Sequence, residues 1–81
     1  MSKIDFKGKT FVVAGAGGIG AATAIALNEY GAKIVVLDIN ENAINDLMPK
    51  LQGDNASYIC DFSNVEGIET LIKNIVKEQG A

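Results

Sequence analysis

The sequence predicts an α/β fold with three layers, in which helices cover the faces of a parallel sheet. Two observations predict it. Short, continuously apolar runs alternate with segments of helical periodicity in the order βαβαβα, and this alternation implies right-handed crossovers between parallel strands. The apolar runs also lack polar alternation, which is typical of strands buried on both faces. With 81 residues the chain forms one domain at most, around a modest core.

The first unit is a strand over residues 9–14, a tight turn and a helix. The strand run is rich in β-branched and aromatic residues and stops at Gly15, as a buried strand does. Apolar residues then recur at helical spacing from Ile19 to Tyr30. Gly31 follows where a left-handed residue commonly ends a helix.

The second unit repeats this order with a strand over residues 33–38. Asn40 is placed to cap the following helix, whose inward stripe contains Ile44 and Leu47. Pro49 removes a backbone donor and clashes with the preceding turn, so we expect this helix to kink or end near Met48.

The third unit begins after the turn residues 53–55 and has a strand over residues 56–60. Residues 63–66, Ser-Asn-Val-Glu, match a capping box, in which Ser63 and Glu66 would each satisfy a backbone donor. We expect the last helix to follow and to run to Gly80.

Composition excludes several classes of function. The net charge is −3 and arginine is absent, so no basic stripe exists for nucleic acid. Without histidine and with Cys60 alone, the chain offers neither a zinc site nor a histidine-based triad. Cys60 is expected to be a small buried apolar residue, which fits a reducing cytoplasm. Residues 1–5 lack the apolar core of a secretory leader, and no apolar run approaches the roughly 18 residues of a membrane span.

Glycines crowd the junction between the first strand and the first helix. Gly15, Gly17 and Gly20 form a G-x-G-x-x-G pattern that ends a strand and opens a helix, the context of a dinucleotide-binding turn. There Gly15 makes the turn, Gly17 lets a pyrophosphate approach the backbone and Gly20 lets the helix pack closely on the strand. The phosphates would meet the free N–H groups of the helix. The alternative is that the glycines serve only a tight turn.

Asp38 ends the second strand, where a dinucleotide site holds an acidic residue. A carboxylate there accepts hydrogen bonds from ribose hydroxyls, whereas a 2′-phosphate would be repelled and would require an arginine. We therefore expect NAD to be preferred over NADP. The alternative for Asp38 is a polar residue that merely ends a strand.

Several further stretches accompany these residues. They are residues 6–13, Gly18-Ile19-Gly20, Tyr30-Gly31-Ala32-Lys33, Asp38 and Cys60-Asp61-Phe62 before Ser63. With them the chain resembles the short-chain dehydrogenase/reductase family over nearly its whole length. The resemblance implies the βαβαβα half of a Rossmann-type fold that holds the adenosine part of NAD(H).

The resemblance also implies roles for individual residues. Asp61 would form a hydrogen bond with the adenine amino group, and Phe62 would contact the base through its backbone. Ile39 would pack beside the ring, and Ile19 would lie by the pyrophosphate next to Gly18. For Asp61 the alternative is a charge that favours the start of the following helix.

Two departures from the family pattern stand out. Ala14 takes the place of a threonine, and only two residues separate Gly15 from Gly18 where the family has three. The family's catalytic Ser and Tyr-x-x-x-Lys pair also do not occur: Tyr30 and Tyr58 lack a lysine four residues later and are expected to be packing residues. The chain ends where a fourth strand is expected, so we predict the N-terminal part of a dinucleotide-binding domain, residues 1–81, without catalytic residues of its own.

A missing fourth strand would expose the edge of the first strand. We expect residues 11–14 to pair there, with a second copy or with further sequence. The parent would transfer a hydride between nicotinamide and a carbonyl or alcohol. Two alternatives are a non-catalytic nucleotide-binding module and a small self-associating structural protein. A methyltransferase is less favoured because Ile19 breaks the G-x-G-x-G pattern, and the residues around Asp61 favour the dehydrogenase family over a flavoprotein.

Overall fold

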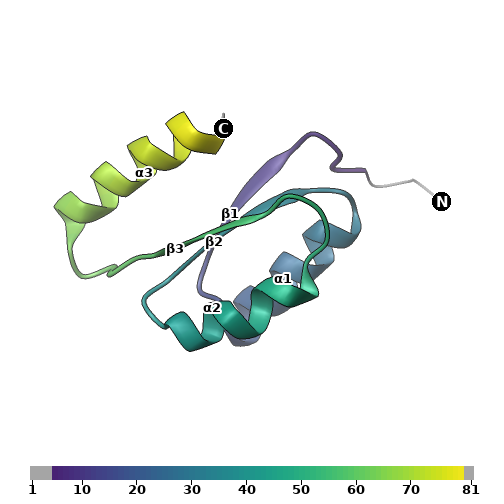
Figure 1. Ribbon diagram of the computed structural model, residues 1–81, viewed down its shortest axis with the longest axis horizontal. Coiled ribbons are helices and arrows are strands. Elements are labelled where there is room, and N and C mark those ends of the chain that lie inside the picture. Colours follow the sequence, from purple (N-terminus) through teal and green to yellow (C-terminus); the bar gives the residue numbers. More distant parts are fainter. Residues whose placement is uncertain (1–4, 80–81) are drawn as a thin grey trace.

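The computed structural model describes residues 5–79, which form a three-layer α/β unit (Figure 1). Three parallel strands, β1 (Thr10–Ala14), β2 (Lys33–Asp38) and β3 (Ala56–Ile59), lie in the order β1-β2-β3. Helices α1 (Gly18–Glu29) and α2 (Glu41–Leu47) cover one face and α3 (Val65–Gln79) covers the other. The predicted βαβαβα order and parallel sheet are confirmed.

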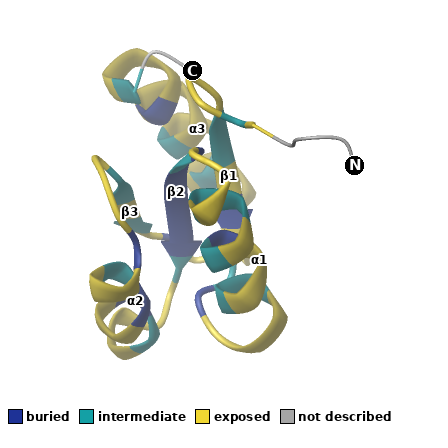
Figure 2. Cartoon of the chain, turned by 90° about the vertical axis from the view of Figure 1, so that its right-hand side faces the viewer, coloured by how far each residue is buried: buried dark blue, intermediate teal, exposed yellow. Residues whose placement is uncertain are grey.

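The central strand β2 explains why its sequence is apolar without alternation. Successive side chains of a strand point to opposite faces. Ile34 and Val36 enter the core under α1 and α2, while Val35 and Leu37 pack with Ile75 of α3. Both faces are therefore covered, and Ile34, Val35 and Val36 have no exposed surface (Figure 2).

The expected helix boundaries around α1 and α2 are confirmed. Gly31 follows α1 with φ +97°, the left-handed conformation that glycine adopts readily. The side-chain oxygen of Asn40 accepts the N–H of Ala43 at 3.2 Å and caps α2. The α-helix ends at Leu47, and a 3₁₀ helix over Met48–Lys50 carries the chain past Pro49.

The predicted capping box at the start of α3 is wrong by one residue. The Oδ1 atom of Asn64 accepts the N–H of Gly67 at 3.0 Å, and the Asn64 carbonyl accepts the N–H of Ile68. Ser63 does not cap the helix because its hydroxyl donates to Asp61 at 2.6 Å instead. The Ser63 hydroxyl is therefore bonded to the Asp61 carboxylate and does not bond to the backbone at the helix end.

Other boundaries differ only slightly from expectation. β1 begins at Thr10 rather than at residue 9, and β3 ends at Ile59 rather than at residue 60. Cys60 is buried as expected, against the core under α3. The expected helix end at Gly80 lies outside the described residues. Residues 1–4, part of the segment expected to lack the apolar core of a secretory leader, also lie outside them. Within residues 5–79, no helix is both long and apolar enough to span a bilayer.

Candidate functional site

The candidate site lies at the carboxyl edge of the sheet, where the loops after all three strands come together. In an open parallel sheet this edge is where ligands bind. The backbone itself joins the loops: the Gly15 N–H donates to the Leu37 carbonyl at 2.7 Å, and the Cys60 N–H donates to the Asp38 carbonyl at 2.9 Å. All residues predicted to contact a cofactor lie in these loops, at the last residue of β2 or in the first turn of α1.

The first loop is a tight turn whose shape depends on glycine. Gly15 has φ +100° and Gly18 has φ +54°, both in the left-handed region. Gly20 faces the backbone of the turn: a Cβ on Gly20 would overlap the Gly15 carbonyl. The close approach predicted for Gly20 is present, and it is made to the turn at the end of β1.

Gly17 differs from these three glycines, because the fold of residues 5–79 does not require glycine there. Its φ of −111° is open to any residue, and a Cβ at this position would meet nothing within 4 Å. A side chain would instead occupy the open space beside the backbone where α1 begins. Gly17 thus leaves backbone N–H groups accessible at a helix N-terminus, where anions are favoured.

Asp38 connects the end of β2 to the glycine turn. Its Oδ2 accepts the N–H of Ala16 at 2.8 Å, and its Oδ1 accepts the N–H of Asn40 at 2.9 Å. These bonds, first from Asn40 and then from Ala16, lower the pKa of Asp38 below its ordinary value. The carboxylate is therefore charged at neutral pH, and each oxygen has a further lone pair for a ligand hydroxyl.

The role of Ala16 was missed by sequence reasoning. Ala16 is buried in the core beneath α1 and α2, and its side chain gives no polar signal. Its backbone N–H is nevertheless the group that fixes the Asp38 carboxylate beside the turn. The only trace in the sequence is its position inside the glycine pattern.

Large apolar side chains surround this edge and face solvent. Ile19 is 86% exposed, Ile39 is 59% exposed and Phe62 is 45% exposed. Ile19 lies in the first turn of α1, Ile39 in the loop after β2 and Phe62 in the loop after β3. An apolar surface at a polar strand edge marks a place where a ligand or partner packs.

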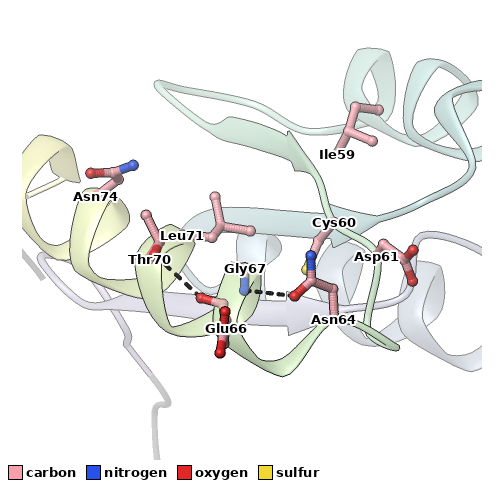
Figure 3. Close-up of a pocket in the computed structure, with 9 residues that line it drawn as sticks. All are labelled: Ile59, Cys60, Asp61, Asn64, Glu66, Gly67, Thr70, Leu71 and Asn74. Atoms are coloured by element: carbon pink, nitrogen blue, oxygen red, sulfur yellow. Dashed lines mark hydrogen bonds between the residues drawn. The ribbon is translucent and has the colours of Figure 1, made fainter.

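Asp61 occupies a different part of the edge from the glycine turn. Its Oδ1 accepts both the N–H and the hydroxyl of Ser63, at 2.9 and 2.6 Å, and these bonds lower its pKa. The side chain lies at one end of a groove of about 540 Å³ between β3 and α3, which Thr70 and Asn74 also line (Figure 3). The structure brings Asp38 to the glycine turn by a hydrogen bond, whereas the Asp61 carboxylate bonds to Ser63.

The two tyrosines have structural roles, as expected from the sequence. The Tyr30 ring packs edge-on against Phe6, with ring centres 6.1 Å apart. The Tyr58 hydroxyl donates to Glu78 and accepts from Gln79, which fastens α3 to β3. Among the residues that the structure describes, no group of three or more acidic, cysteine or histidine side chains is placed to hold a metal.

Known proteins share this arrangement of strands and helices. A solved citronellol catabolism dehydrogenase (AtuB) from Pseudomonas aeruginosa superposes with a TM-score of 0.89 at 28% identity, over 100% of this chain and 36% of that one. An NAD⁺-bound xylitol dehydrogenase gives 0.86 at 35% identity, over 93% and 30%. A metagenomic short-chain oxidoreductase in complex with NADP gives 0.84 at 29% identity, over 98% and 37%.

Sequence comparison gives the same grouping. The Arabidopsis thaliana protein "Short-chain dehydrogenase reductase 3c" is 34% identical over 82 aligned residues, which cover 99% of this chain and 32% of that protein. This chain thus spans about a third of the length of the relatives it matches. The family model described as "short chain dehydrogenase" matches residues 9–81. The chain therefore belongs to the short-chain dehydrogenase family, whose members are oxidoreductases with a Rossmann-type fold.

Proposed function

We propose that this chain binds the adenosine and pyrophosphate part of NAD(H) at the carboxyl edge of its sheet. The observation that carries the proposal is Gly17: neither backbone conformation nor packing within residues 5–79 requires a glycine there. The need for an unobstructed approach to the backbone accounts for its absent side chain. The pyrophosphate would lie over Gly17 and Gly18 at the start of α1, beside the exposed Ile19.

The ribose would lie at Asp38. This carboxylate is charged and held in place by two backbone N–H groups, so its remaining lone pairs accept ribose hydroxyls without a rearrangement. A 2′-phosphate would bring negative charge against it, and the chain has no arginine to compensate. One structural neighbour binds NAD⁺ and another NADP, and Asp38 supports NAD for this chain.

The adenine would lie beside the residues that follow β2 and β3. The exposed Ile39 side chain would pack beside the ring, and Phe62 would contact the base through its backbone. The Asp61 carboxylate would accept a hydrogen bond from the adenine amino group, since its pKa is lowered and it is charged. Each group present thus fits the part of the cofactor assigned to it.

The contribution of this chain to the reaction would be to bind and orient the cofactor. A bound nicotinamide supplies or accepts the hydride in a carbonyl–alcohol conversion. The Ser and Tyr-x-x-x-Lys residues of the family pattern do not occur in the 81 residues, so this chain alone is expected to bind without turnover. The family match does not favour a purely structural protein. The free, buried Cys60 supports a reducing cytoplasm as its location.

Titration of the chain with NADH, followed by cofactor fluorescence or calorimetry, tests the proposal. Gly17→Ala is expected to weaken binding about tenfold or more, equivalent to about 1.4 kcal/mol, because the methyl group obstructs the phosphates. Its thermal midpoint should stay near that of the wild type, since the added Cβ meets no protein atom within 4 Å. Gly20→Ala is the contrasting variant and should lose stability itself. Wild-type protein that binds no NADH would overturn the proposal, as would Gly17→Ala that binds normally.

A further inference from the structure

The carboxylates of Asp38 and Asp61 lie at the ends of neighbouring strands, but their hydrogen bonds are distributed differently. The two Asp38 oxygens each accept one backbone N–H, Oδ2 from Ala16 and Oδ1 from Asn40. In Asp61 both bonds reach the same oxygen, because Oδ1 accepts the N–H and the hydroxyl of Ser63, at 2.9 and 2.6 Å. Within residues 5–79, Asp61 Oδ2 accepts no hydrogen bond. Oδ1 is thus occupied, and Oδ2 is the oxygen that can accept from a ligand.

The backbone around Asp61 is fixed relative to Asp38. The Cys60 N–H donates to the Asp38 carbonyl at 2.9 Å, and the buried Cys60 side chain packs in the core under α3. On the other side, the Asp61 carbonyl accepts the Asn64 N–H at 3.1 Å. The Asp61 side chain itself is exposed, so no core packing selects its rotamer. The remaining freedom of this residue lies in its side-chain torsions.

The Ser63 hydroxyl supplies a bond that restricts these torsions. The bond from the Ser63 N–H belongs to an ordinary turn, in which an aspartate accepts the backbone two residues on. Any residue except proline at position 63 would provide that N–H. The second bond requires the serine side chain, and its length of 2.6 Å is typical of the stronger bonds from a hydroxyl to a charged carboxylate.

Helix α3 does not use this hydroxyl. Serine at a helix start commonly caps the helix, but here the Oδ1 atom of Asn64 accepts the Gly67 N–H at 3.0 Å (Figure 3). Within residues 5–79, the Ser63 hydroxyl bonds only to Asp61. The effect of the hydroxyl is therefore expected at the carboxylate rather than in the fold.

We infer that Ser63 is a positioning residue for the adenine base, acting through Asp61. The inference rests on the proposed function, in which the Asp61 carboxylate accepts a hydrogen bond from the adenine amino group. Ser63 occupies Oδ1 and leaves Oδ2 as the acceptor for one N–H of that group. Ser63 thereby contributes to the choice of adenine over a base without the 6-amino group. Asp38, with one backbone bond on each oxygen, keeps a lone pair on both and suits the two hydroxyls of a ribose.

The size of the effect follows from the rotamers that the Ser63 hydroxyl excludes. An aspartate without this bond samples three staggered χ1 wells, so its loss reduces the affinity for a cofactor that uses Asp61 by up to about threefold. A cofactor without the amino group makes no bond to this carboxylate. Its affinity should therefore not depend on Ser63.

Calorimetric titration with two cofactors tests the inference. They are NADH and its analogue with unsubstituted purine as the base, in which hydrogen replaces the 6-amino group. The wild type should bind NADH about tenfold more tightly, because the analogue lacks one hydrogen bond to a charged group. Ser63→Ala should reduce this preference about threefold and leave the affinity for the purine analogue unchanged. Ser63→Thr retains a hydroxyl and should retain the preference.

Two further variants serve as controls. Asp61→Ala removes the acceptor itself and should bind the two cofactors equally. Ser57→Ala removes the same hydroxyl from an exposed position in β3 and should leave both affinities unchanged.

A second readout needs no cofactor. The Ser63 hydroxyl and then the Ser63 N–H lower the pKa of Asp61. Titration of the Asp61 carboxyl by NMR should therefore give a pKa closer to the ordinary value in Ser63→Ala, and a wild-type value in Ser63→Thr. An unchanged pKa in Ser63→Ala would overturn the inference, because the hydroxyl would then not hold the carboxylate.

The binding results separate this inference from the proposed function. An equal loss for both cofactors in Ser63→Ala would show a purely structural role and overturn the inference. So would Ser63→Ala that keeps the full preference for NADH, or Ser63→Thr that behaves as Ser63→Ala does. A wild type that binds neither cofactor overturns the proposed function and this inference with it, whereas a preference for NADH that is independent of Ser63 overturns the positioning role alone.

Discussion

The Asp38 carboxylate accepts the backbone N–H of Ala16 at 2.8 Å, across 22 residues of sequence. This bond joins the end of β2 to the glycine turn after β1. The group proposed to bind the ribose therefore also holds the turn proposed to bind the pyrophosphate. Changes at Asp38 are expected to affect both parts of the site together.

Asp38→Asn separates charge from shape at this position. The amide keeps one acceptor oxygen of nearly the same geometry, so only one of the N–H groups of Ala16 and Asn40 retains its partner. We expect NADH to bind about tenfold more weakly. NADPH should lose less, because the repulsion of its 2′-phosphate is removed.

Calorimetric titrations with both cofactors measure this difference. Asp54→Asn, which removes an exposed carboxylate in the turn before β3 at the opposite edge of the sheet, is the matched control and should leave both affinities unchanged. An equal loss for NADH and NADPH would contradict the role of Asp38 in selecting between them.

The lowered pKa of Asp38 predicts how stability depends on pH. A group whose pKa is lower in the folded than in the unfolded chain stabilises the fold above its unfolded value, and that contribution is lost as pH falls through the folded value. The ordinary value for Asp38 is 3.8, and the N–H groups of Asn40 and Ala16 lower it. The difference in thermal midpoint between wild type and Asp38→Asn should therefore be constant from neutral pH to about pH 5 and shrink below about pH 4.

Thermal melts at a series of pH values provide the measurement. The Asp61 carboxyl also titrates in this range, with a pKa lowered by Ser63, so the comparison is repeated in an Asp61→Asn background. The Asp38 contribution should persist there. A difference that grows on acidification would have the wrong sign.

The order of elements followed from sequence because each signal was local. The apolar run in β2, the cap at Asn40 and the break at Pro49 depend on neighbours within a few residues. The capping box failed at a local competition: Ser63 has two possible partners, and its hydroxyl bonds to the Asp61 carboxylate. A sequence pattern shows that such a side chain can cap a helix, but it does not show whether another group competes for the same hydroxyl.

The site was predicted as a set of residues but not as a geometry. The glycine pattern and Asp38 stand out in the sequence, whereas the bond from Ala16 to Asp38 depends on the register of two parallel strands. The distinction between Gly17 and Gly20 also required the fold. Only the packing of α1 shows that one glycine faces the Gly15 carbonyl and the other faces open space.

A similar long-range connection lies at the opposite edge of the sheet, around Asn28 near the end of α1. Its side-chain nitrogen donates to the carbonyls of Ala32 and Gln52 at 3.0 and 2.9 Å, and its Oδ1 accepts the Gln52 N–H at 2.7 Å. The Oδ1 atom of Asn55 accepts the Ile34 N–H in the same cluster. One half-buried amide thus fastens α1 to the start of β2 and to the loop before β3.

Asn28→Ala should destabilise the fold without changing the cofactor site. Truncation leaves backbone groups of Ala32 and Gln52 without their protein partner, at a cost of about 2 kcal/mol. For a domain of this size the thermal midpoint should fall by about 10 °C. Asn45→Ala, at an exposed position of α2, should change it little. Because the cluster lies at the opposite edge from Asp38, folded Asn28→Ala should bind NADH as the wild type does, and a selective loss of affinity at full folding would show that the two edges are coupled.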